Sequence, residues 1–290
     1  MAVPAALQVP GGVDPAELER VACEVARDAG RLVVDHRPAD LAQSAKSTRT
    51  DVVTEMDQRS QELILGRLAA LRPHDAAMGE EEGARTGTSG VTWVLDPIDG
   101  TTNYLYGIPQ FSVSVAAVVG DPAVPGAWRP VAGAVLNPSH DELFHAHVGG
   151  GAHLTTGSGT RALRASATTE LALSLVGTGF GYDADRRRRQ ARLLVDLLPL
   201  VRDIRRHGSA ALDLCSVACG RLDGYYETGL NAWDRAAGEL VATEAGAVLG
   251  GLDDEVASSS LLWAAAPGIA GELSERVRSL TRTHVADGAG

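Results

Sequence analysis

The chain contains the stretch Trp93-Val94-Leu95-Asp96-Pro97-Ile98-Asp99-Gly100-Thr101-Thr102-Asn103. Its apolar beginning predicts a strand that runs directly into two aspartates, Asp96 and Asp99. Pro97 fixes its own φ and supplies no backbone donor, so we expect the chain to turn as the strand ends. Both carboxylates can then converge at the carboxyl end of the strand, where they repel one another unless they share a proton or a cation.

The next residues add groups suited to an anion. Gly100 lets the backbone approach a ligand closely, and Thr101 and Thr102 offer N–H and hydroxyl donors at a predicted helix start. Carboxylates for a cation beside donors for an anion predict a metal-assisted phosphate site. The alternative is an aspartate-rich turn that only precedes a helix. The combination of a strand, Asp-Pro-x-Asp-Gly-Thr and a second threonine favours the site.

Composition limits the class of protein. A hydrophobic fraction of 44% with 22% charged residues over 290 residues is ordinary for a soluble globular enzyme. The formal net charge of −11 argues against nucleic acid or an anionic membrane as a partner. Cys23, Cys215 and Cys219 are too few, and odd in number, for a disulfide framework. We expect no signal peptide and no membrane span, and therefore a cytoplasmic protein.

Predicted helices and strands alternate along the chain without an internal repeat. We expect a flexible tail at residues 1–13 and one mixed α and β domain at residues 14–290, with two lobes at approximately 14–150 and 151–290. The predicted helices cover residues 15–37, 54–72, 186–198, 208–218, 235–245 and 269–282. The predicted strands cover residues 76–78, 93–95, 111–119, 131–136, 142–147, 171–176, 202–206, 222–227 and 261–266.

Two acidic segments away from the central stretch, residues 80–82 and Asp234, have two interpretations each. Glu80, Glu81 and Glu82 lie between glycines and form either a solvated loop or a loop from which one carboxylate reaches the same cation. Asp234 is either the N-cap of the predicted helix 235–245 or a further cation ligand, since aspartate is a preferred N-cap residue.

Other groups of residues support weaker hypotheses. His140, Asp141, His145 and His147 suggest zinc, but His145 and His147 share one face of a predicted strand and no cysteine lies nearby, so exposed hairpin side chains are favoured. The glycines of residues 177–181 do not have the spacing of a dinucleotide-binding loop. The arginine run 186–189 is read as a solvated helix face that can also attract an anionic substrate.

Three pieces of the chain together resemble the inositol monophosphatase family of magnesium-dependent, lithium-sensitive phosphatases. They are Gly79-Glu80-Glu81, Asp96-Pro97-Ile98-Asp99-Gly100-Thr101, and Trp233-Asp234 with the later Glu244-Ala245-Gly246. The resemblance covers roughly residues 14–282. Lys46, the only lysine, lies with residues 51–54 in a segment similar to a mobile loop of the family.

The resemblance implies an α+β fold, a layered αβαβα sandwich, in a homodimer. It also implies two or three Mg²⁺ ions, a water nucleophile activated by metal, and roles for particular residues. Glu80, Asp96, Asp99, Asp234 and the Ile98 carbonyl would hold the metals, and Glu80 and Thr101 would orient the attacking water. The Gly100 and Thr101 amides would hold phosphate oxygens, and Ala210, Glu227 and Asp234 would contact the alcohol.

The implied substrate is a phosphate monoester of a small polyol. Thr102-Asn103 resembles the inositol-phosphatase branch, whose substrate is myo-inositol 1-phosphate, whereas the histidinol-phosphate branch tends to carry a basic residue at the position of Thr102. Histidinol phosphate and fructose 1,6-bisphosphate remain alternatives within the family. A different class of function is a regulatory partner of the transcription machinery, because some family members have such roles.

Overall fold

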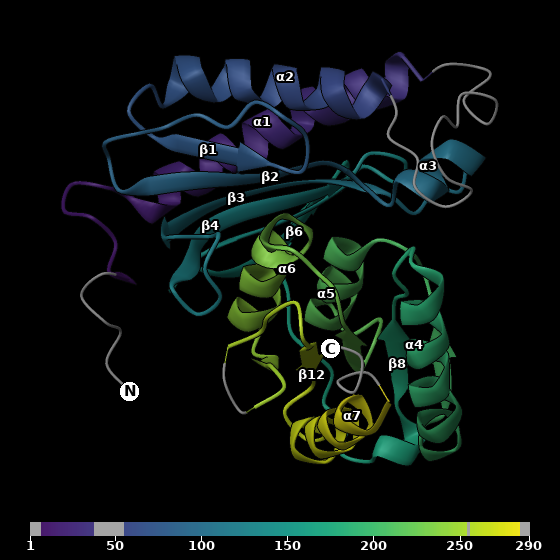
Figure 1. Ribbon diagram of the computed structural model, residues 1–290. Coiled ribbons are helices and arrows are strands. Elements are labelled where there is room, and N and C mark those ends of the chain that lie inside the picture. The colour runs from purple at the N-terminus through teal and green to yellow at the C-terminus, as the bar shows by residue number, and fades with distance from the viewer. Residues whose placement is uncertain (1–6, 38–54, 254–255, 285–290) are drawn as a thin grey trace.

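A computed structural model describes residues 7–37, 55–253 and 256–284. Within these residues, helices and sheets alternate in five layers, which Figure 1 shows from α1 and α2 at the top to α7 at the bottom and α4 at the right of the lower half. The predicted αβαβα sandwich is therefore confirmed. Lys46 and residues 51–54 lie outside the described residues.

The first layer contains two helices that cover one face of the first sheet. α1 (Pro15–Asp35) begins where the sequence predicts, because the Asp14 carboxylate accepts a hydrogen bond from the Ala16 amide and Pro15 needs no partner for its nitrogen. α2 (Glu55–Leu71) lies beside it. Their apolar faces pack on Trp93, Leu95 and neighbouring residues of the sheet.

The first sheet has seven strands in the order of the chain. β1 and β2 are parallel, and every later neighbour pair is antiparallel. The strands are β1 (Ala76–Gly79), β2 (Val91–Asp99), β3 (Ser112–Gly120), β4 (Trp128–Asn137), β5 (Glu142–His147), β6 (Gly151–Thr156) and β7 (Gly159–Ala162).

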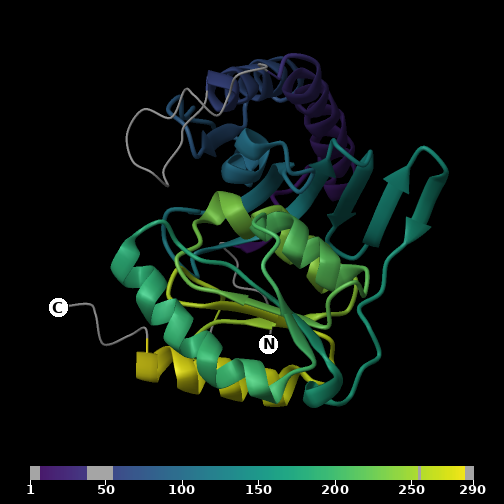
Figure 2. The same cartoon turned by 90° about the vertical axis from the view of Figure 1, so that its right-hand side faces the viewer.

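The middle layer contains α5 (Ala210–Ala218) and α6 (Ala232–Glu244), which pack between the two sheets. The second sheet has the order β11-β12-β10-β8-β9, and α4 and α7 cover its outer face (Figure 2). These elements are β8 (Leu175–Thr178), α4 (Ala184–Leu197), β9 (Asp203–Arg205), β10 (Gly224–Glu227), β11 (Val248–Gly250), β12 (Leu262–Ala265) and α7 (Ala270–His284). No helix among the described residues is both long and apolar enough to cross a membrane.

Several predicted elements require correction. The apolar run 171–176 is not one strand, because a 3₁₀ turn (Leu171–Leu173) precedes β8. β6, β7 and β11 were not predicted, since they have only six, four and three residues and each contains a glycine, which is depleted in strands. The β4–β5 hairpin is confirmed, but His145 and His147 are not exposed, because both contact Glu19 of α1 and are half-buried.

Candidate functional site

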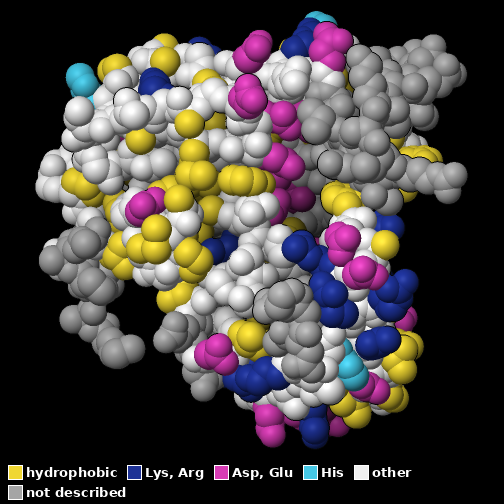
Figure 3. Space-filling view, viewed as in Figure 1, with side chains coloured by type: hydrophobic (Ala, Val, Ile, Leu, Met, Phe, Trp, Pro, Cys, Tyr) yellow, Lys and Arg dark blue, Asp and Glu magenta, His cyan; other side chains and the backbone are white. Residues whose placement is uncertain are grey.

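A pocket of about 280 Å³ lies where the first sheet, the middle helices and the second sheet meet. In Figure 3 acidic side chains gather in the hollow between the two halves of the molecule, and basic side chains are common on the lower half. The acidic residues that line the pocket are Asp57, Glu80, Glu81, Asp96, Asp99, Asp213, Glu227 and Asp234. The arginines that line it are Arg186 and Arg206.

A β-bulge brings the two central aspartates into the pocket. Asp96 pairs with Ser114 and Asp99 with Ser112, so three steps along β2 match two along β3. In a regular strand, residues three apart face opposite sides, and the extra residue of the bulge corrects this. The predicted turn at Pro97 is therefore wrong, because strand pairing resumes at Asp99. The predicted convergence of the aspartates in one pocket is confirmed.

Asp99 is bound to the beginning of α5. Its carboxylate accepts hydrogen bonds from the Ser209 hydroxyl at 2.5 Å, the Ala211 amide at 2.8 Å and the Ala210 amide at 3.3 Å. Burial raises the pKa of Asp99 to about 6, and these three donors oppose the increase. Asp99 therefore joins the first sheet to the middle layer as well as facing the pocket.

Asp96 has fewer partners. One of its oxygens accepts from the Ile98 amide at 3.1 Å, and the side chain is buried. Burial, with the charges of Glu80 and Asp99, raises the pKa of Asp96 well above its usual range. An ionised Asp96 consequently needs a cation beside it.

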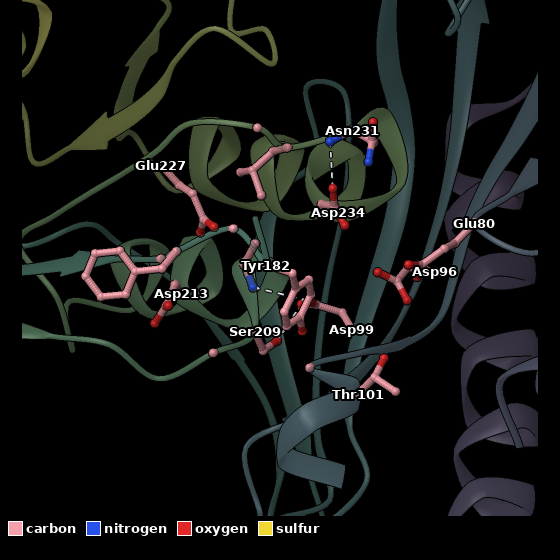
Figure 4. Close-up of a pocket in the computed structure, with 18 of the residues that line it drawn as sticks. Glu80, Asp96, Asp99, Thr101, Tyr182, Ser209, Asp213, Glu227, Asn231 and Asp234 are labelled. Carbon is pink, nitrogen blue, oxygen red and sulfur yellow. Dashed lines mark hydrogen bonds between the residues drawn. The ribbon is translucent and has the colours of Figure 1, made fainter. Parts of the chain in front are cut away.

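Glu80 follows β1 directly and reaches the same pocket, which decides between its two interpretations. Figure 4 shows the Glu80 and Asp96 side chains directed toward one another. One side of Glu80 is exposed, yet burial of its carboxyl and the charges of Asp234 and Asp57 raise its pKa to about 8. Glu80 is therefore exposed to solvent and also lines the pocket, as the second interpretation of this loop requires.

Asp234 is not the N-cap of its helix, and that interpretation is corrected. α6 begins at Ala232 with Asn231 as N-cap, and the Asp234 carboxylate accepts from the Asn231 amide at 2.6 Å in a capping box. Burial, followed by the charge of Asp99, raises the pKa of Asp234 to about 7. Asp234 thus both supports the helix start and faces the pocket.

Ile98, Gly100 and Thr101 line the pocket where β2 ends and α3 (Thr101–Tyr106) begins. Gly100 has a φ of 92°, and a Cβ there would lie 3.0 Å from the Gly208 carbonyl oxygen, so a side chain is excluded. The Thr101 hydroxyl donates to the Ile98 carbonyl oxygen at 3.0 Å. That oxygen retains a second lone pair for another partner.

Figure 4 shows Glu227 across the pocket from Glu80, and Ala210 also lines the pocket. Tyr225 donates its hydroxyl hydrogen to the Glu227 carboxylate, while burial raises the pKa of Glu227 to about 8. A Cβ at Gly179 would lie 1.9 Å from a Glu227 oxygen, so the glycine-rich loop makes room for this carboxylate. The loop thus borders the pocket.

The arginine run divides between the pocket and the surface. Arg186 lines the pocket, whereas Arg187 donates to the Gly181 carbonyl oxygen at 2.9 Å and Arg188 pairs with Asp185. Thr102 is within hydrogen-bond distance of the Tyr182 hydroxyl, at 3.2 Å.

Among the charged residues of the pocket, sequence reasoning missed Asp57, Asp213 and Arg206. Asp57 lies in the first turn of α2, is buried and lines the pocket. Asp213, bonded to His207 at 2.6 Å, and Arg206 also line it. The sequence signal for Asp57 is an acidic residue close to Glu55 at the start of a helix. No local sequence pattern marks Asp213 or Arg206.

The chain matches known proteins over most of its length. The model of the inositol monophosphatase family matches residues 14–286. Inositol-1-monophosphatase SuhB of Mycobacterium tuberculosis is 47% identical over 276 residues, which is 90% of this chain and 93% of that protein. The Nus factor SuhB of Pasteurella multocida is 38% identical over 264 residues, 89% of this chain and 94% of that protein.

A solved structure agrees with these relatives. Mycobacterium tuberculosis SuhB superposes with a TM-score of 0.76 at 45% identity, covering 92% of this chain and 98% of that one. Family members use divalent metal ions, and a pocket lined by buried carboxylates fits that property. The chain belongs to the inositol monophosphatase family and is a phosphatase.

Proposed function

We propose that this phosphatase hydrolyses a phosphate monoester of a small polyol, and that its substrate is myo-inositol 1-phosphate. The observation that carries the proposal is the convergence of Glu80 at the end of β1, Asp96 and Asp99 of β2, and Asp234 of α6 on one pocket. Phosphate-monoester hydrolysis is among the slowest reactions in water, with enzymatic accelerations up to about 10²¹-fold. One acid or base contributes only about 10²–10⁴-fold, so further electrostatic help is required.

The donor set fits Mg²⁺. The proposed ligands are the carboxylates of Glu80, Asp96, Asp99 and Asp234 and the carbonyl oxygen of Ile98, with Asp57 added because it is buried at the same wall. Oxygen ligands without sulfur or imidazole favour Mg²⁺ over zinc. When bound, two or three Mg²⁺ ions supply a more acidic water and neutralise charge on the phosphate oxygens.

The protein's own groups then position the reactants. Glu80 and Thr101 are proposed to orient the attacking water, which Figure 4 supports by showing both at the same end of the pocket as Asp96. The Gly100 and Thr101 amides are proposed to donate to phosphate oxygens. The side-chain hydroxyl of Thr101 already donates to Ile98, which fixes the orientation of the threonine.

The alcohol is proposed to lie toward Glu227, Ala210 and Asp234. Glu227 accepts from Tyr225 with one oxygen and has further lone pairs for a substrate hydroxyl. The name of the M. tuberculosis relative, inositol-1-monophosphatase, supports the same substrate. Arg186 and Arg206 also line the pocket, which keeps fructose 1,6-bisphosphate, with its second phosphate, as an alternative within this proposal.

Phosphate release from a panel of monoesters tests the proposal. We expect myo-inositol 1-phosphate to give a higher kcat/KM than histidinol phosphate or fructose 1,6-bisphosphate, and we expect EDTA to abolish and Li⁺ to inhibit the reaction. Full activity in EDTA would exclude the metal mechanism. A preference for another monoester would replace the substrate and leave the mechanism intact.

The family resemblance also supports a cytoplasmic homodimer without nucleic-acid or membrane partners.

A second candidate function is a regulatory partner of the transcription machinery, favoured by the name of the P. multocida relative, a Nus factor. Asp96→Asn separates the two functions. An inactive variant that still co-purifies with transcription complexes as the wild type does would establish the regulatory role.

A further inference from the structure

A second group of side chains of the types that can bind metal ions lies away from the pocket, on the α1 side of the first sheet. Glu19 of α1, His145 of β5 and His153 of β6 each offer one ligand atom, and these atoms all lie within 4.8 Å of one another. His145 and His153 are direct partners across the two antiparallel strands. Their rings stack with centroids 5.6 Å apart.

The neighbouring His147 holds Glu19 from the other side. One Glu19 oxygen is 2.6 Å from Nδ1 of His145, and the other contacts Nδ1 of His147. We name Glu19, His145, His147 and His153 the histidine cluster. The ring of His153 makes no hydrogen bond to any residue that the structure describes, so its nitrogens are available to a ligand.

The chain around the cluster is arranged to hold these rings. A Cβ at Gly150 would lie 2.3 Å from the His147 ring, so the turn between β5 and β6 makes room for it. The Glu244 carboxylate of α6 accepts from the Gly149 and Gly151 amides, each at 3.0 Å, and fixes this turn. Thr155 lies 2.9 Å from Nε2 of His145. Fixed rings lose little freedom when they bind an ion.

The donor chemistry differs from that of the catalytic pocket. Imidazole nitrogens with one carboxylate are typical ligands of zinc and related transition metals, whereas Mg²⁺ prefers oxygen. Ligand atoms about 2.0 Å from a tetrahedral zinc ion are roughly 3.3 Å apart, so side chains within 4.8 Å need to move by only about 1 Å. β5 is the third strand from β2, so about 14 Å of sheet separates the two groups.

We propose that Glu19, His145 and His153 bind a transition-metal ion of the zinc type. His147 acts as a positioning residue, because it holds the Glu19 carboxylate. The bound ion joins α1 to the β5–β6 hairpin and stabilises the outer edge of the first sheet. Cys23, one turn after Glu19, lines the same depression, but its sulfur is outside the set of close ligand atoms.

Zinc titration of the full-length, chelator-treated protein tests this site, with excess Mg²⁺ present to occupy the oxygen-lined pocket. Isothermal titration calorimetry is expected to detect one Zn²⁺ ion per chain. His153→Asn and Glu19→Gln are each expected to weaken its affinity at least about tenfold. Zn²⁺ is expected to raise the melting temperature of the wild type and not of these variants.

His140→Asn is the matched control, since His140 is an exposed histidine in the turn before β5. It should bind Zn²⁺ as the wild type does, and Cys23→Ser should as well. Retained Mg²⁺-dependent phosphatase activity verifies that His153→Asn and Glu19→Gln are folded. Equal Zn²⁺ affinity in the wild type and both cluster variants, or no binding by the wild type, would overturn the proposal.

Discussion

The catalytic pocket and the histidine cluster both bring possible metal ligands together on the first sheet, but they are built differently. The pocket collects carboxylates from both halves of the chain, and backbone amides or hydroxyls bind several of them. The cluster collects three imidazoles and one carboxylate from α1 and a single hairpin. The two sites therefore differ in the atoms they offer a metal ion, oxygen in the pocket and mainly imidazole nitrogen in the cluster. They also differ in the groups that hold these side chains in place, and both differences distinguish the sites better than the number of charged residues does.

Asp96→Asn and Asp99→Asn sharpen the comparison most, because they test whether pocket carboxylates hold ions or only structure. Both should reduce kcat/KM by more than about a hundredfold, since even outer-shell partners of a metal cost about 10–100-fold. Stability should separate them. An amide at Asp96 still accepts from Ile98 and removes a buried charge, whereas an amide NH₂ at Asp99 opposes the α5 donors.

Kinetics and thermal melting without metal measure both effects. Asp96→Asn should melt at or above the wild-type temperature and Asp99→Asn below it. Asp121→Asn, on an exposed turn, is the control for the substitution itself. Normal turnover in either pocket variant would contradict its role as a ligand.

Asp234→Asn tests whether Asp234, which belongs to the capping box of α6, is also required for turnover. The asparagine side-chain oxygen can still accept from the Asn231 amide, so the melting temperature should change little. Turnover should decrease severely, by more than about tenfold, because a neutral amide is a poor cation ligand. Measuring kcat and the melting temperature of this one variant decides the question. Unchanged values of both would leave Asp234 with a structural role only.

The pH dependence of stability in EDTA tests the electrostatic side of the comparison. Burial and like charges raise the folded-state pKa values of Glu80 to about 8 and Asp234 to about 7, above the 4.5 and 3.8 of the same side chains in an unfolded chain. The folded state therefore binds more protons than the unfolded state between about pH 4 and pH 8. The free energy of unfolding should decrease as pH rises through this window, by up to about 1.4 kcal/mol per pH unit for each proton retained.

Denaturant unfolding at several pH values measures this slope. Saturating Mg²⁺ should flatten the curve, because the ion stabilises the ionised carboxylates. Asp96→Asn should also reduce the slope. Stability in EDTA that is constant or increases with pH would show that burial and like charges do not raise the pKa values of these carboxyl groups.

Glu227→Gln is expected to have the smallest effect and concerns the substrate. Loss of one acceptor should cost myo-inositol 1-phosphate about 1 kcal/mol in kcat/KM, roughly fivefold. Above about pH 8, where Glu227 is ionised, histidinol phosphate should lose more, because its ammonium group then loses an opposite charge. Side-by-side kinetics of both substrates on both proteins measure this difference. An equal loss for both would remove Glu227 from substrate discrimination.

Local sequence patterns predict much of the pocket, because residues 96–101 are contiguous in the chain. The apolar residues before them predict the strand, and the threonines that end the motif predict the helix start. Asp57 was missed because an acid at a helix start has a sufficient local explanation, and only the fold shows that it faces Glu80. The predicted turn at Pro97 failed for a related reason. A proline lacks only one ladder hydrogen bond, and a β-bulge accommodates it without ending the strand.

The histidine cluster shows the same limit more strongly. The face shared by His145 and His147 follows from strand periodicity. Their contact with Glu19 joins residues 126 and 128 positions apart, which no periodicity contains. Without that partner the histidines appeared to be ordinary hairpin side chains. Tertiary contacts, and not local preference, determine the burial of such residues.

The attachment of Asp99 to α5 provides a natural spectroscopic reporter. The amide hydrogens of Ala210 and Ala211 are donated to a carboxylate that also faces the pocket. Their exchange with solvent requires these hydrogen bonds to open locally. A ligand that binds to the Asp99 oxygens should change the exchange rates and chemical shifts of these two amides more than those of the other amides of α5. Occupancy of the pocket can thus be followed without a turnover assay.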